Sequence, residues 1–249
     1  MSDELHTEVP GETGKTGDCA SRLLLVRKRI GEACLRVGRD PGEVSLIAVS
    51  KTKPVSMIEE LYAAGQRLFG ENRPQELRDK AAVLPGDILW HMIGHLQKNK
   101  IKYVVGTSAL IHSVDSYELA SAIHEEAAKR NTGPVSVLLE VNVAEEASKF
   151  GLHSEETIRL AKKISGLSNI RIQGLMTVAP FVEDPEQNRP VFRELRELSV
   201  DIASENIDNV HMSVLSMGMT NDFEVAVEEG ASCVRVGTAI FGSRNMQVN

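Results

Sequence analysis

Two lysines follow an apolar run near the start of the chain, in the segment LIAVSKTKP. The uncharged amine of Lys51 or Lys53 could attack an aldehyde or ketone to form an imine. A free lysine has a pKa near ~10.4, so this chemistry needs burial or a second cation to lower that pKa. On an extended strand the two side chains point to the same side, so each should disfavour charging of the other. Lys51 lies nearer the apolar run, and we expect it to be the imine-forming residue.

A second group of candidate residues lies near the end of the chain, in LSMGM and VRVGTAIFG. Ser216 and Thr238 carry hydroxyls, while Gly218 and Gly237 would let backbone N–H groups approach an anion closely. Met217 lies between two of these positions. Tight turns alone would explain the glycines but not both hydroxyls. These residue types predict a cup for a phosphate group.

An imine-forming lysine opposite a phosphate cup fits two kinds of protein. One is a Schiff-base aldolase that acts on a phosphorylated sugar. The other is a protein that binds pyridoxal 5′-phosphate, a cofactor with both an aldehyde and a phosphate. Arg235 lies two residues before Gly237, so it can point into the same site. An arginine is a fitting partner for a pyridine nitrogen, which an aldolase substrate lacks, so Arg235 favours the cofactor.

The elements that must position these residues alternate between short apolar runs and longer amphipathic segments. Apolar residues recur at helical spacing over 21–37, 56–65, 74–84, 116–130, 154–165 and 188–204. Several of the apolar runs are apolar on both faces, as parallel strands covered on both sides are. The runs predict strands over 44–50, 67–70, 88–94, 110–114, 135–143, 170–178, 211–216 and 233–237.

Eight strands alternating with helices predict a single (β/α)₈ barrel with an extra N-terminal helix, and a doubly wound sheet is the alternative. We assign residues 21–249 to one barrel domain and residues 1–20, which are polar, to a disordered tail. In such a barrel the chemistry lies at the C-terminal ends of the strands. Asn72, His91 and Met176 belong to strand-end motifs of this kind and are further candidates.

Composition excludes several other functions. The formal net charge of −7 disfavours a nucleic-acid partner, and no apolar run is long enough to span a membrane. Three cysteines without a C-x-x-C spacing indicate reduced thiols, so we expect a cytoplasmic protein. His91 and His95 fall on a strand and the turn after it, which does not favour a metal site. The segment GETGKTG has valine where a phosphate loop needs its first glycine.

The motifs AVSKTKP, FGENR, WHMIGHLQKNK, GLMTV, LSMGM and VRVGTAIFG, in this order, resemble the pyridoxal phosphate homeostasis protein family. That family is related to the N-terminal barrel of alanine racemase, and the resemblance covers roughly residues 21–245. It implies a barrel without the racemase's C-terminal β domain. It also implies pyridoxal phosphate as a Schiff base on Lys51, Arg235 at the pyridine nitrogen, and phosphate contacts from Ser216, Gly237 and Thr238.

The resemblance implies a role in cofactor homeostasis without an established reaction. The residues agree, because an arginine at the ring nitrogen would weaken the electron sink that carbanion chemistry uses. Racemisation also needs a second acid or base, usually a tyrosine, and the three tyrosines all fall in expected helical segments. We expect a monomeric binding protein that holds the cofactor and passes it to apoenzymes. A weak amino-acid racemase is the alternative.

Overall fold

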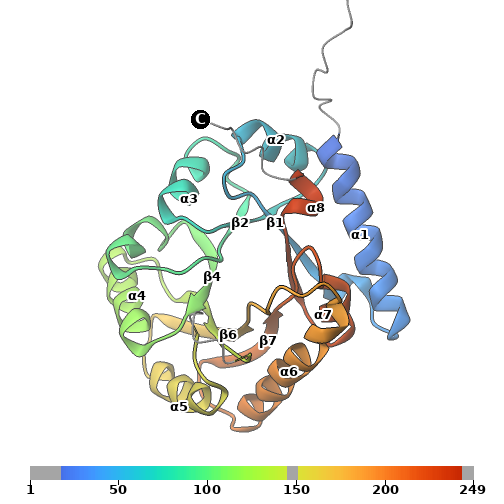
Figure 1. Ribbon diagram of the computed structural model, residues 1–249. Helices are drawn as coiled ribbons and strands as arrows, with labels where there is room; N and C mark the ends of the chain where they lie inside the picture. Colours follow the sequence, from blue (N-terminus) through green and yellow to red (C-terminus); the bar gives the residue numbers. More distant parts are fainter. Residues whose placement is uncertain (1–17, 145–150, 243–249) are drawn as a thin grey trace, which may run out of the picture.

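The computed structural model describes residues 18–144 and 151–242, which form a ring of parallel strands surrounded by helices (Figure 1). All eight expected strands are present, and they close into a barrel in chain order. The closed barrel was the prediction, so the doubly wound alternative is wrong. The strands are β1 Ser45–Val49, β2 Leu68–Glu71, β3 Leu89–Met92, β4 Ser108–Val114, β5 Val135–Glu140, β6 Ile170–Met176, β7 Val210–Ser216 and β8 Cys233–Val236.

Helices follow most of the strands on the outside of the barrel. Short 3₁₀ helices η1 (Pro41–Glu43), η2 (Lys98–Tyr103) and η3 (Pro185–Asn188) lie among them. The element after β3 is η2 in place of an α-helix. The α-helices are α1 Asp18–Arg36, α2 Val55–Ala63, α3 Pro74–Ala81, α4 Tyr117–Arg130, α5 Ser154–Ser165, α6 Arg189–Ser204, α7 Phe223–Glu228 and α8 Thr238–Phe241.

Apolar periodicity explains why the outer helices form and how they pack. In α4, Leu119, Ile123 and Ala127 recur at four-residue spacing and are all buried against the sheet. The helix ends with Asn131 as its C-cap, which adopts the left-handed conformation (φ 55°) and donates its N–H to carbonyls of the last turn. The main hydrophobic core therefore lies between the strands and the ring of helices. A smaller cluster of Leu110, Leu138 and Met176 lies inside the barrel.

The extra helix α1 covers the place where the first and last strands meet. It packs on α2, α7 and α8, and Figure 1 shows it outside the ring beside α8. Its first turn is capped from α2, because Glu60 Oε1 accepts the N–H groups of Cys19 and Ala20 at 3.1 Å each. The helix begins three residues before the expected boundary, and residues 1–17 lie outside the described residues.

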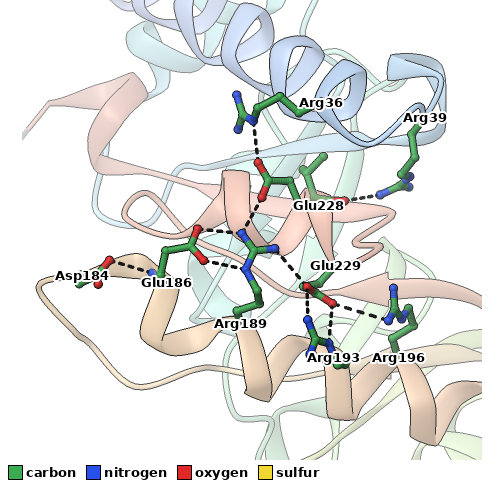
Figure 2. Close-up of polar contacts among 10 residues, drawn as sticks. Arg36, Arg39, Asp184, Glu186, Arg189, Arg193, Arg196, Glu228 and Glu229 are labelled. Atoms are coloured by element: carbon green, nitrogen blue, oxygen red, sulfur yellow. Dashed lines mark hydrogen bonds and ion pairs between the residues drawn. The ribbon is translucent and has the colours of Figure 1, made fainter.

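A network of arginines and glutamates joins α1 and α6 to the end of α7 (Figure 2). Glu228 pairs with Arg36 of α1 and with Arg189 of α6, both at 2.6 Å. Glu229 pairs with Arg189 and Arg193 at 3.1 Å, and with a third arginine of α6. We call the set Arg36, Arg189, Arg193, Arg196, Glu186, Glu228 and Glu229 the Arg–Glu network.

The described residues include neither a helix suited to a membrane nor a cluster suited to a metal ion. No helix there combines the length and the apolar character needed to cross a membrane. No group of three or more His, Cys, Asp or Glu side chains in residues 18–144 and 151–242 is arranged to hold a metal ion. Cys19, Cys34 and Cys233 are buried free thiols.

Candidate functional site

A cavity of about 540 Å³ opens at the C-terminal ends of the strands. Five of the predicted site residues line it: Lys51, Asn72, Arg235, Gly237 and Thr238. They come from different parts of the sequence and meet because parallel strands of a barrel end on one face. The rest of the wall consists of Val49, Ile93, Val178, Pro180, Phe181, Met219, Thr220, Asn221 and Asp222.

Lys51 and Lys53 lie on a tight turn and not on an extended strand. Strand β1 ends at Val49, and the N–H of Lys53 donates to the carbonyl of Ser50 at 3.0 Å. Thr52 between the two lysines has a φ of 62°. The expectation that both lysines share one side of a strand is therefore wrong. Lys51 lines the cavity, while Lys53 Nζ donates to the carbonyls of Phe241 and Gly242 at 3.4 and 3.2 Å.

Arg235 is held from two sides on the inner face of β8. Its Nη1 donates to Ser216 Oγ at 2.5 Å, and its Nη2 donates to the carbonyl of Thr177 at 2.8 Å. The side chain is buried, and burial lowers the pKa of Arg235, although Cys233, Glu140 and Asp222 act in the opposite direction. A fixed guanidinium thus lies in the wall of the cavity, with its orientation set by strands β6 and β7.

Ser216 and His91 lie inside the barrel and do not line the cavity. Ser216 is fully buried, and its Oγ also contacts His112 Nδ1 at 2.9 Å. His112 Nε2 in turn lies 2.8 Å from His91 Nδ1. Burial lowers the pKa of His91 to about 4 and that of His112 well below its usual value, so both rings are neutral at neutral pH. This chain, Arg235–Ser216–His112–His91, runs from Arg235 in the cavity wall into the barrel.

The remaining candidates divide between the interior and the wall. Met176 belongs to the apolar cluster inside the barrel, and Met217 is fully buried in the core outside it. A Cβ on Gly237 would lie 3.3 Å from Val49 Cβ, so a larger residue would crowd the wall beside Lys51. Thr238 begins α8 and is exposed.

Several residues of the wall carry no strong signal in the sequence. Phe181 stands 87% exposed at the cavity, on the loop between β6 and η3. That loop is fixed by the buried amide of Asn188, which donates to the carbonyl of Pro180 at 2.9 Å and to Asp222 Oδ2 at 2.8 Å. The other oxygen of Asp222 accepts the N–H of Met219 at 2.7 Å. Asp222 thus ties together the loops that follow β6 and β7.

Glu140 is a buried acid that the sequence did not single out. It ends strand β5, where it pairs in register with Met176. Burial raises its pKa to about 7; Asp115 adds to this shift and Arg235 opposes it. Its Oε2 atom has no hydrogen-bond partner among the described residues. A carboxyl that titrates near neutrality therefore lies inside the barrel.

The sequence and the fold both match known proteins. The model of the alanine racemase N-terminal domain family matches residues 34–245. A pyridoxal phosphate homeostasis protein of Aquifex aeolicus is 45% identical over 91% of this chain and 99% of its own length. PipY of Synechococcus elongatus, solved with pyridoxal phosphate bound, is 35% identical with a TM-score of 0.78, over 90% of this chain and 100% of its own.

An alanine racemase of Clostridium difficile shares the fold alone. It is 13% identical with a TM-score of 0.71, and the match covers 92% of this chain but 58% of the racemase. The matched part of the racemase is thus one barrel, with the rest of its chain unmatched. The long, high-identity matches and the eight-stranded barrel agree with the motifs. The chain belongs to the pyridoxal phosphate homeostasis protein family, on the barrel of the alanine racemase N-terminal domain.

Proposed function

We propose that the protein binds pyridoxal 5′-phosphate in the cavity at the strand ends and takes part in the intracellular balance of this cofactor. The observation that carries the proposal is the meeting of Lys51, Arg235, Gly237 and Thr238 around one cavity of about 540 Å³. A cavity of this size suits a small ligand. The cofactor supplies an aldehyde that a lysine amine can capture.

The residues present fit the three functional groups of the cofactor. Lys51 would hold the aldehyde carbon as an imine, with loss of the aldehyde oxygen as water. Arg235 would donate to the pyridine nitrogen, because its guanidinium carries five N–H groups and the bonds to Ser216 and Thr177 use two of them. Gly237 and Thr238 would hold the phosphate through a hydroxyl and backbone N–H groups. Helix α8 has only four residues, so these groups matter more than its dipole.

We propose that the protein is a carrier and not an enzyme with a robust reaction. Arginine stays charged, so Arg235 would leave the ring nitrogen unprotonated and the ring a weak electron sink. No tyrosine lines the cavity within the described residues. Tyr62 donates to Asp87 at 2.7 Å, and the rings of Tyr103 and Tyr117 face lysines. The tyrosine that usually serves racemisation as its second acid is therefore not among the described wall residues, and apoenzymes that depend on pyridoxal phosphate are the expected recipients.

The proposal is tested by the absorption spectrum of the protein mixed with pyridoxal phosphate. We expect a visible imine band, and borohydride reduction followed by peptide mass spectrometry should place the adduct on Lys51. The Lys51→Ala variant should lose the band and Lys53→Ala, the matched control, should keep it. An unchanged band in Lys51→Ala would show that the lysine assignment is wrong, and mass spectrometry would then show whether Lys53 replaces it.

The racemase alternative is tested by incubating the loaded protein with amino acids in D₂O. We expect NMR to show negligible exchange of the α-proton. Exchange at a turnover of about 1–10³ per second, as for ordinary enzymes, would overturn the carrier proposal.

A further inference from the structure

The turn that carries Lys51 holds a strained residue. Thr52 has a φ of 62°, in the left-handed region that a β-branched side chain rarely adopts. Glycine is the usual residue for this region, and the turn contains none. Such a conformation persists only when the surrounding structure holds it in place. Contacts from the surrounding structure must therefore hold the residues on each side of Lys51.

A buried ammonium group holds the residue before Lys51. Lys80 of α3 has an 8% exposed side chain, and its Nζ bonds the carbonyl of Ser50 at 2.8 Å. The same Nζ bonds Glu71 Oε1 and Glu76 Oε1, each at 2.7 Å. An ammonium has three donors, so these bonds satisfy all of them. Ser50 is fixed a second time, because its hydroxyl donates to Glu71 Oε1 at 2.6 Å.

The residue after Lys51 is held by the same cluster. The N–H of Thr52 donates to Glu76 Oε1 at 2.7 Å, the oxygen that also receives Lys80. Glu71, at the end of β2, is fully buried, and Glu76 is 21% exposed on α3. We call Glu71, Glu76 and Lys80 the anchoring cluster. It fixes the backbone on both sides of Lys51, while the Lys51 side chain lines the cavity.

We propose that Lys80 and Glu76 are positioning residues that hold the Lys51 amine where it can meet the aldehyde of the cofactor. The inference rests on the proposed imine at Lys51 and assigns a part in it to residues outside the cavity. A small misplacement of a reacting group can slow or weaken a reaction strongly. The anchoring cluster should therefore matter for imine formation and much less for binding of a ligand that forms no imine.

The test compares two ligands on four variants. Pyridoxal 5′-phosphate forms the imine, whereas pyridoxine 5′-phosphate has an alcohol in place of the aldehyde and binds without it. Glu76→Ala removes the acceptor for Thr52, and Glu76→Gln keeps an acceptor oxygen but removes the charge. Asp79→Ala, on the same helix, is the matched control. Affinities are measured by calorimetry, and imine formation by absorbance after rapid mixing.

In Glu76→Ala we expect the affinity for pyridoxal phosphate to fall about tenfold, which corresponds to about 1.4 kcal/mol. The affinity for pyridoxine phosphate should stay within about twofold, and Glu76→Gln should stay close to wild type in both. Lys80→Met should resemble Glu76→Ala. Because Lys80 is buried and its variant could fail to fold, the partly exposed Glu76 carries the test.

Three results would overturn the inference. Equal losses for both ligands in Glu76→Ala would show a general structural role. Equal losses of imine in Glu76→Ala and Glu76→Gln would show that charge matters and position does not. Unchanged imine formation in Glu76→Ala would show that the cluster does not position Lys51. A wild-type protein that forms no imine at Lys51 would instead refute the proposed function, and this inference with it.

Discussion

Replacing Ser216 with alanine tests whether the buried hydrogen-bonded chain Arg235–Ser216–His112–His91 stabilises the folded protein. Ser216 Oγ contacts Arg235 Nη1 at 2.5 Å and His112 Nδ1 at 2.9 Å, in a fully buried position. The variant would leave a charged donor and a ring nitrogen without this partner. Each buried polar group left unsatisfied costs about 1–3 kcal/mol. We therefore expect the free energy of unfolding to fall by about 3 kcal/mol in the protein without cofactor.

Urea unfolding of the cofactor-free protein measures this loss, with Ser213→Ala as the control on the same strand. Ser213 is exposed and its hydroxyl makes one long bond of 3.4 Å, so its variant should stay within about 0.5 kcal/mol of wild type. The sequence suggests another role for Ser216, a direct contact with phosphate. That role predicts unchanged stability without cofactor and a loss of affinity only. A loss of stability under about 0.5 kcal/mol would refute the reasoning from the buried chain.

Three further predictions follow from other contacts. Because burial raises the pKa of Glu140 from 4.5 to about 7, the folded protein holds a proton that the unfolded chain releases. The stabilisation that this proton contributes, about 3 kcal/mol, is complete below pH 4.5 and is lost as the pH rises to 7. In urea titrations at pH 5 and 8, Glu140→Gln should lack this part of the pH dependence of the free energy of unfolding. Gly218→Ala should cost about 2 kcal/mol or more in urea unfolding, since φ is 90° and the new Cβ would lie 2.5 Å from Ala226 Cβ. Glu229→Ala removes pairs with three arginines and should cost about 1–2 kcal/mol, less in high salt, by urea unfolding at two salt concentrations.

The order of elements could be predicted from sequence because each strand is a short apolar run between amphipathic segments. Strand boundaries came within a few residues, as β1 shows, with Ser45–Val49 observed against 44–50 expected. All strands of a barrel end on one face, which explains why Lys51, Arg235 and Thr238 meet at the cavity. For these residues the type and the place along a strand were enough.

The rest of the site depends on contacts that no local pattern records. The bond between Ser216 and His112 joins positions 104 apart in the chain, and it exists only in the register of the closed barrel. The turn at Thr52 has no glycine to mark it, because the anchoring cluster, and not local preference, holds its positive φ. Strand alternation therefore placed Lys53 on the wrong side. Register shifts in the β3–β4 and β6–β7 pairs also break the strict alternation of side chains on which such a prediction relies.

The contacts of α1 have a consequence for how the barrel is made. This helix packs on α7 and α8, about 200 residues further along the chain, and Arg22 Nε donates to the carbonyl of Ile240 at 2.6 Å. During synthesis on the ribosome, the N-terminal helix emerges long before these partners exist. Its contact with α2 can form early, but the part of α1 that packs on α7 and α8 stays uncovered until β8 pairs with β1 and closes the barrel. Contacts of such long range form slowly, so we expect docking of α1 to mark the last stage of folding.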